Sequence, residues 1–217
     1  MGAIKGAIVD GILTAMWVFS VPLLGVFSSI TANYVGVEAM SIAALFITIN
    51  VAALLMLTFS LIGAALGGAS FNPATTITLY MAGLKPDASL MSMALSFPAQ
   101  AAGGVGGAMA IRGVMPHHHR HVLKGGPSLR VDLHTGAIAE GVWLLAVATV
   151  GLVMAGGKYT GPSMNPANAY GWAYLGNRHT TWDFFYVYWI CPFIGAVLAA
   201  FVSKFLFKAA PIKEKKS

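Results

Sequence analysis

Charged residues are scarce in this chain. Asp, Glu, Lys and Arg make up 9% of its 217 residues, against about a quarter of a typical soluble domain. Hydrophobic residues make up 57%, and several apolar runs reach the roughly 20 residues that a helix needs to cross a bilayer core. The composition excludes an ordinary soluble domain and predicts an all-α protein that crosses a membrane several times.

Other features that the sequence lacks exclude further classes. The single cysteine, Cys191, cannot form an intrachain disulfide. No nucleophile–base pair, phosphate-binding loop or cofactor motif is present, so we expect neither an enzyme nor a bound cofactor. Four histidines crowd between His117 and His121, but no second ligand group has a clear spacing from them, so no metal site is predicted.

The net charge of +6 comes from basic residues at 112–130 and 204–216, outside the apolar runs. Basic residues in these places are typical of membrane flanks, and we expect no nucleic-acid partner. The pattern predicts one membrane domain in two parts, with about five full spans. The expected spans are residues 6–30, 39–63, 90–111, 133–155 and 184–207. The expected parts are a first repeat at 1–112, a loop at 113–132, a shortened second repeat at 133–210 and a basic tail at 211–217.

The tripeptide Asn-Pro-Ala occurs twice, as Asn72-Pro73-Ala74 and as Asn165-Pro166-Ala167. Each copy ends a seven-residue frame, Gly-Ala-Ser-Phe-Asn-Pro-Ala in the first and Gly-Pro-Ser-Met-Asn-Pro-Ala in the second. One Asn-Pro-Ala is an ordinary turn sequence. Two copies in matching frames between apolar spans indicate an internally duplicated channel or transporter.

The repeat extends to both sides of the motif. Asp10 and Glu140 occupy equivalent places ahead of the two frames, and Pro98 and Pro192 occupy equivalent places after them. Small residues follow each proline, and such residues let membrane helices approach closely. In the first half these residues are Ala99, Ala102, Gly103 and Gly106.

One interval breaks the repeat. Asp10 precedes Asn72 by 62 residues, whereas Glu140 precedes Asn165 by only 25, a difference of 37. That difference is enough for one crossing of about 20 residues and its connecting loop. The second half therefore lacks a helix.

The motif also predicts a chemistry. Proline is favourable at the first position of a helix, and the helix N-terminus carries a partial positive charge. If two short helices meet at their N-termini inside the bilayer, Asn72 and Asn165 offer amide N–H donors to a passing solute. Water accepts both bonds through its oxygen, while cations meet the positive helix ends.

These features resemble the aquaporins, and within them the small basic intrinsic proteins of plants. The resemblance implies six helices and two half-helices around a water-conducting pore, one pore per chain of a tetramer, in the endoplasmic reticulum membrane. A dilysine-like end at Lys213 and Lys215 agrees with that membrane. The resemblance rests on residues 68–76, 98–100, 125–129, 134–140, 158–174, 182–183 and 185–190.

The resemblance also assigns roles to single residues. Asp10 and Glu140 brace the half-helix loops by accepting backbone N–H bonds, a structural role that we prefer to proton transfer. Most members have an arginine after the second motif, where this chain has Asn168. By analogy the selectivity filter consists of Ala52, Val153, Pro162 and Asn168.

The missing helix conflicts with this picture. With two crossings before the first motif and four before the second, both half-helices enter from the same face and their N-termini cannot meet. If residues 133–155 do not cross the membrane, the two half-helices again enter from opposite faces. The wall of the pore is then two helices short. Two hypotheses therefore stay open: a passive water channel, or a shortened non-conducting member that at most assembles with complete subunits as a homo- or hetero-tetramer.

Overall fold

The computed structural model describes residues 2–83, 85, 88–123, 126–145 and 163–206, and every element in them is helical. The spanning-length helices are α1 (Ala3–Val35), α2 (Ile42–Ala65) and α4 (Leu90–Val114). The motif helices are α3 (Pro73–Ala82) and α7 (Pro166–Leu175). The remaining elements are the 3-10 helix η1 (His117–Leu123), α5 (Leu133–Leu145), α8 (Trp182–Phe185), the π-helical η2 (Tyr186–Ile190) and α9 (Cys191–Leu206).

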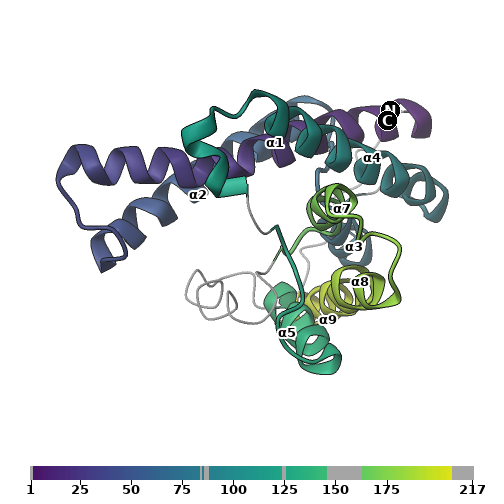
Figure 1. The fold of residues 1–217 in the computed structure, drawn as a ribbon. Helices are drawn as coiled ribbons and strands as arrows, with labels where there is room; N and C mark the ends of the chain where they lie inside the picture. Colours follow the sequence, from purple (N-terminus) through teal and green to yellow (C-terminus); the bar gives the residue numbers. More distant parts are fainter. Residues whose placement is uncertain (1, 84, 86–87, 124–125, 146–162, 207–217) are drawn as a thin grey trace.

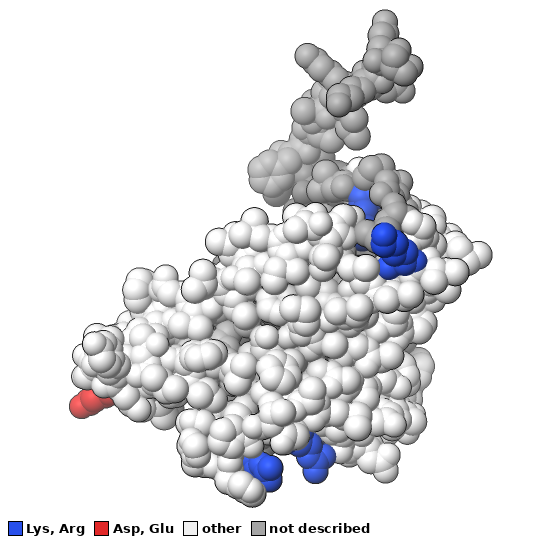
Figure 2. Space-filling view, turned by 90° about the horizontal axis from the view of Figure 1, so that it is seen from above, with Lys and Arg blue, Asp and Glu red and all other residues white. Residues whose placement is uncertain are grey.

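The helices form two groups with the motif helices between them (Figure 1). In one group α4 and α2 pack on α1, and in the other α5 packs on α9. Helix α7 packs on α4, whereas α3 packs on α9, so each motif helix packs against a different group. The face in Figure 2 is uncharged across its centre, with basic and acidic side chains only at its rim, as expected of a surface that meets lipid.

Local sequence explains where the long helices begin and end. Helix α1 ends at Gly36, whose φ of 74° suits glycine. The hydroxyl of Ser41 caps α2 by accepting a bond from the N–H of Ala44 at 3.1 Å. Ser89 and Ser92 form a capping box at the start of α4.

Among the described residues, three helical segments are long and apolar enough to cross a bilayer: Ala3–Val35, Ile42–Ala65 and Trp182–Val202. Helix α4 has 25 residues but is less apolar, because it is rich in glycine and serine. The fourth expected span, 133–155, is described only to Leu145. Helix α5 has 13 residues, which corresponds to about 20 Å at a rise of 1.5 Å per residue.

Glycines bring α4 into backbone contact with two neighbours. A Cβ on Gly103 or Gly107 would overlap the carbonyl oxygen of Gly11 or Ala15 in α1. A Cβ on Gly104 would overlap the carbonyl oxygen of Ala167 at the start of α7. Of the small residues expected to pack after Pro98, Ala99 and Gly103 contact Gly11 of α1, whereas Ala102 is exposed and Gly106 faces open space.

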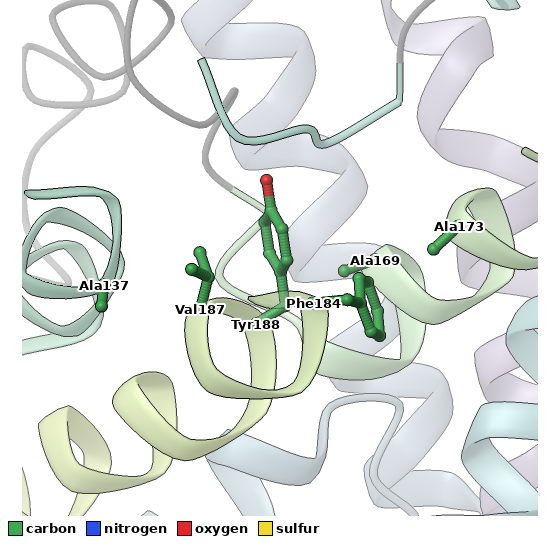
Figure 3. Close-up of a cluster of buried hydrophobic side chains, with 6 residues drawn as sticks. All are labelled: Ala137, Ala169, Ala173, Phe184, Val187 and Tyr188. Carbon is green, nitrogen blue, oxygen red and sulfur yellow. The ribbon is translucent and has the colours of Figure 1, made fainter. Parts of the chain in front are cut away.

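A second core joins α5, α7 and the α8–η2 segment. Tyr188 and Phe184 lie with ring centroids 5.4 Å apart, and in Figure 3 the hydroxyl of Tyr188 points away from the rest of the cluster. The buried members are Ala137, Ala169, Ala173, Phe184, Val187 and Tyr188.

The glycine contacts give a matched pair of substitutions. Gly104→Ala inserts a methyl group against the Ala167 carbonyl and should destabilise the protein by about 1–3 kcal/mol, the usual cost of overpacking. Gly106→Ala inserts the same group into open space and should be neutral or slightly stabilising, since alanine favours a helix. Thermal unfolding of both variants in the same detergent checks this, and equal midpoints would contradict the packing.

Candidate pore site

The two asparagines of the motif cap their helices in the same way. Asn72 precedes Pro73, and its Oδ1 accepts a bond from the N–H of Ala74 at 2.9 Å. Asn165 precedes Pro166, and its Oδ1 accepts from the N–H of Ala167 at 3.0 Å. Their φ angles are −143° and −142°. The repeated sequence therefore produces a repeated conformation, with the same side-chain cap and proline at the first helical position.

Each asparagine also bonds to the other motif. The Nδ2 of Asn72 donates to the carbonyl oxygen of Met164 at 2.8 Å. The Nδ2 of Asn165 donates to the carbonyl oxygen of Phe71, also at 2.8 Å. Each acceptor is the residue directly before the opposite asparagine, so the pair of bonds is reciprocal. The N-termini of α3 and α7 thus meet.

This meeting corrects the expectation that the two N-termini cannot approach each other. That expectation came from counting 133–155 as one complete crossing. Only residues 133–145 of that segment are described, and residues 146–162 lie outside the described part of the chain. The reciprocal bonds bring the two motifs together whatever the number of crossings between them.

The two acids bond to the loops that lead into the motifs. Asp10 is 4% exposed, and its Oδ1 accepts a bond from the N–H of Ser70 at 2.8 Å. Glu140 is 1% exposed, and its Oε1 accepts from the N–H groups of Ser163 at 3.3 Å and Met164 at 3.1 Å. In both halves a buried carboxylate thus binds the segment just before the asparagine.

Sequence reasoning did not single out the serines of the two frames. The hydroxyl of Ser70 donates to the carbonyl oxygen of Asn72 at 3.1 Å, and that of Ser163 donates to the carbonyl oxygen of Asn165 at 2.9 Å. The signal was available, because serine is the third residue of both frames.

Two further residues support the first motif alone. Gln100 of α4 is fully buried, and its Nε2 donates to the carbonyl oxygen of Ser70 at 2.8 Å. Phe71 packs between two aromatic rings, with centroid distances of 4.6 Å to Trp17 and 5.6 Å to Phe59. No repeat in the sequence points to either residue, since both depend on contacts between distant segments.

The expected filter residues are only partly described. Asn168 is 6% exposed, and its Nδ2 donates to the hydroxyl of Ser163 at 3.1 Å. Its Oδ1 is buried and has no partner among the described residues. Ala52 is half-buried on α2, which packs chiefly on α1. Val153 and Pro162 lie outside the described residues.

The site has the electrostatics of two facing helix N-termini. Each terminus is equivalent to roughly half a positive charge, and both asparagines present amide N–H groups there. Within the described residues no three His, Cys, Asp or Glu side chains are grouped to hold a metal ion. The arrangement therefore favours a polar solute that accepts hydrogen bonds.

Comparisons with known proteins agree with this geometry. The family described as Major intrinsic protein matches residues 133–203. The chain is 46% identical to Aquaporin SIP1-1 of Oryza sativa subsp. japonica, with 99% of this chain and 98% of the relative covered. It is 45% identical to Aquaporin SIP1-2 of Zea mays, with 98% and 96% covered. Aquaporin SIP1-1 of Arabidopsis thaliana is 39% identical, with 100% and 98% covered.

A solved structure supports the fold. The X-ray structure of the aquaglyceroporin from Plasmodium falciparum matches 93% of this chain and 96% of its own, with a TM-score of 0.63 and 19% identity. The alignment with the rice relative has 241 positions, whereas this chain has 217 residues. The difference between 241 and 217 means that the chain has no residue at 24 or more of those positions.

The comparisons confirm the resemblance that the motifs indicated. The family's members are membrane channels for water or small solutes and not enzymes. The chain therefore belongs to the major intrinsic protein family, beside the plant aquaporins named SIP1.

Proposed function

We propose that this chain is a passive water channel of an intracellular membrane, with Asn72 and Asn165 at the centre of a single-file pore. The observation that carries the proposal is the reciprocal pair of hydrogen bonds, which sets the two amide groups side by side at two helix N-termini. The resemblance to the small basic intrinsic proteins favours the endoplasmic reticulum membrane and assembly as a tetramer with one pore per chain.

The mechanism follows from the number of amide hydrogens. Each Nδ2 carries two hydrogens, and the bond to the opposite loop uses one of them. The second hydrogen of each amide is available to a passing molecule. A water molecule accepts both through its oxygen, which turns its own hydrogens away and breaks the chain of waters that a proton needs. The positive helix ends repel cations at the same point.

The filter in this proposal has no arginine. Asn168 is neutral, its Nδ2 donates to the hydroxyl of Ser163, and its buried Oδ1 has no partner among the described residues. With Ala52, Val153 and Pro162 as the other members, the constriction is less polar than one with arginine. Water still passes, and the rejection of cations depends more on the two helix N-termini.

A second candidate function is a non-conducting subunit that assembles with complete members of the family. The shortfall of 24 or more positions against the rice relative favours it. So does the exposure of α2, where only Phe59 and Gly63 are buried among the described residues of that helix. A pore wall must seal against lipid, and a chain short of one helix gains that seal from a neighbouring subunit.

The proposed donor role predicts the effect of two isosteric substitutions. Asn72→Asp or Asn165→Asp keeps the oxygen that caps the helix, removes the Nδ2 donor and adds a negative charge. Each lost bond costs about 1 kcal/mol. Water permeability of proteoliposomes should fall and cation leak should rise, as read by stopped-flow light scattering and a pH-sensitive dye. Asn33→Asp at the exposed end of α1 is the control, and an equal change in that variant would contradict the donor role.

The proposed bracing role of the acids predicts a different pattern. Asp10→Asn keeps an acceptor oxygen for the N–H of Ser70, whereas Asp10→Ala leaves that buried N–H unsatisfied at a cost of about 1–3 kcal/mol. The midpoint of thermal unfolding should therefore change little in Asp10→Asn and fall clearly in Asp10→Ala. Water flux should be unchanged in Asp10→Asn. If the unmodified chain conducts protons and this variant does not, proton transfer would be favoured instead.

Water permeability of the 217-residue chain distinguishes the two candidate functions. We expect flux above that of empty liposomes, lost in Asn165→Asp, for the chain as it stands. The comparison is a version with a helix restored after Glu140, reconstituted at equal protein content. Flux in the restored version alone would reject the channel proposal for this chain and leave it as a subunit that needs complete partners.

A further inference from the structure

A basic pocket lies away from the two motifs, at the end of α4. Its volume is about 770 Å³, and three arginines line it: Arg112 in the last turn of α4, Arg120 in η1 and Arg178 after α7. These three come from separate segments of the chain. None of the described residues that line the pocket is Asp or Glu.

Apolar side chains form the rest of the pocket wall. Met109 lies one turn before Arg112 on α4, and Trp172 and Leu175 lie on α7. Gly126 closes the wall by packing on Trp172, because a Cβ at this glycine would come within 2.6 Å of the Trp172 Cβ. The pocket thus combines a cationic rim with an apolar side.

Two of the arginines are held in place by their own surroundings. The Nε of Arg120 donates to the carbonyl oxygen of Met115 at 3.2 Å. The guanidinium of Arg178 packs on Gly176, where a Cβ would lie 3.0 Å from its Nε. Both groups keep further N–H donors, since a guanidinium has five.

The ordinary explanation of these arginines is that they neutralise helix C-termini. Helices α4 and α7 both end at the pocket, and each C-terminus is equivalent to roughly half a negative charge. Two such ends offset only about one of the three positive charges. No Asp or Glu among the described lining residues offsets the remaining charge. The pocket therefore keeps a net positive charge that an anion would balance.

The position of Arg112 along α4 indicates how deep in the bilayer the pocket lies. The helix has 25 residues, about 37 Å at 1.5 Å per residue, against a bilayer core of about 30 Å. Because Arg112 lies in its last turn, the pocket lies at the level of the lipid headgroups. Tryptophan at this level is typical of the membrane interface, and basic pockets between membrane helices bind lipid headgroups.

We propose that Arg112, Arg120 and Arg178 form a binding site for a phosphate group. The geometry favours the phosphomonoester of an anionic phospholipid, with its first acyl carbons against Met109, Trp172 and Leu175. Arginine suits this ligand because its planar fork pairs with two phosphate oxygens at once. The site does not depend on conduction and is independent of the proposed water pathway.

The test is a binding titration with purified protein in detergent. Dioctanoyl phosphatidic acid and dioctanoyl phosphatidylcholine are compared as lipid probes by native mass spectrometry, and inorganic phosphate is titrated separately. The variant is Arg112→Gln with Arg178→Gln. The charge-matched control is Lys5→Gln with Lys85→Gln, because these lysines lie by the starts of α1 and α4, at the opposite end of the bundle.

We expect phosphatidic acid to bind better than phosphatidylcholine and its affinity to fall about tenfold or more per arginine removed, from the usual strength of hydrogen bonds between charged groups. The lysine control should bind as the unmodified chain does. Replacing both arginines with lysine keeps the positive charges but loses the planar guanidinium that pairs with two phosphate oxygens. This variant should therefore keep part of the affinity. Thermal unfolding verifies that each variant is folded.

Each outcome decides the matter. Binding of both phosphatidic acid and inorganic phosphate, lost in the arginine variant, supports the site with phosphate alone as sufficient ligand. Binding of the lipid only, lost in the same variant, supports the headgroup as the source. No preference for phosphatidic acid, or equal binding by the folded arginine variant, overturns the proposal.

Discussion

The rest of the structure depends on one constraint: two helix N-termini of like partial charge are held in contact inside an apolar protein. Facing N-termini repel each other and bring unsatisfied N–H groups together. The chain offsets this with acceptors on every side. Asn72 and Asn165 cap their own helices and donate to each other's loop, and Asp10 and Glu140 accept N–H bonds from the segments just ahead. Removing one acceptor leaves a buried donor that nothing else in the bilayer core can satisfy.

Helix α4 shows how packing supports this contact. Its glycines meet α1 through Gly103 and Gly107 and meet α7 through Gly104, so α4 fixes the distance between the first helix and the second motif. Gln100, on the same helix, reaches the loop of the first motif. One helix therefore positions both motifs. This explains why α4 is less apolar than the other long helices: its glycines face the backbone of α1 and α7, where small residues matter more than hydrophobic ones.

The sequence predicted what depends on the repeat or on local composition. The motif helices with proline at their first position, the equivalence of Asp10 and Glu140 and three of the spans follow from spacing and apolar length. The sequence did not distinguish Gly104 from Gly106, because that difference is set by which neighbour each residue meets. It placed Gln100 among the residues of the resemblance but gave it no role, because Gln100 acts across 30 residues. It wrongly predicted that the two N-termini stay apart. A count of crossings decides at which face of the membrane each loop lies, but the sequence does not show which segments complete a crossing.

The shortening and the pore centre concern different parts of the molecule. Among the described residues, the bonds that hold the two motifs together come from Asp10, Gln100, Glu140 and the two frames themselves. By the internal repeat, the missing residues belong between Glu140 and the second frame. The loss therefore leaves in place the donors, acceptors and helix ends where the two motifs meet. What it removes is part of the helical wall around them. Whether water passes is then decided by how the side of the pore is closed, by lipid or by a neighbouring subunit, since a file of water needs apolar walls on all sides as well as the two amides.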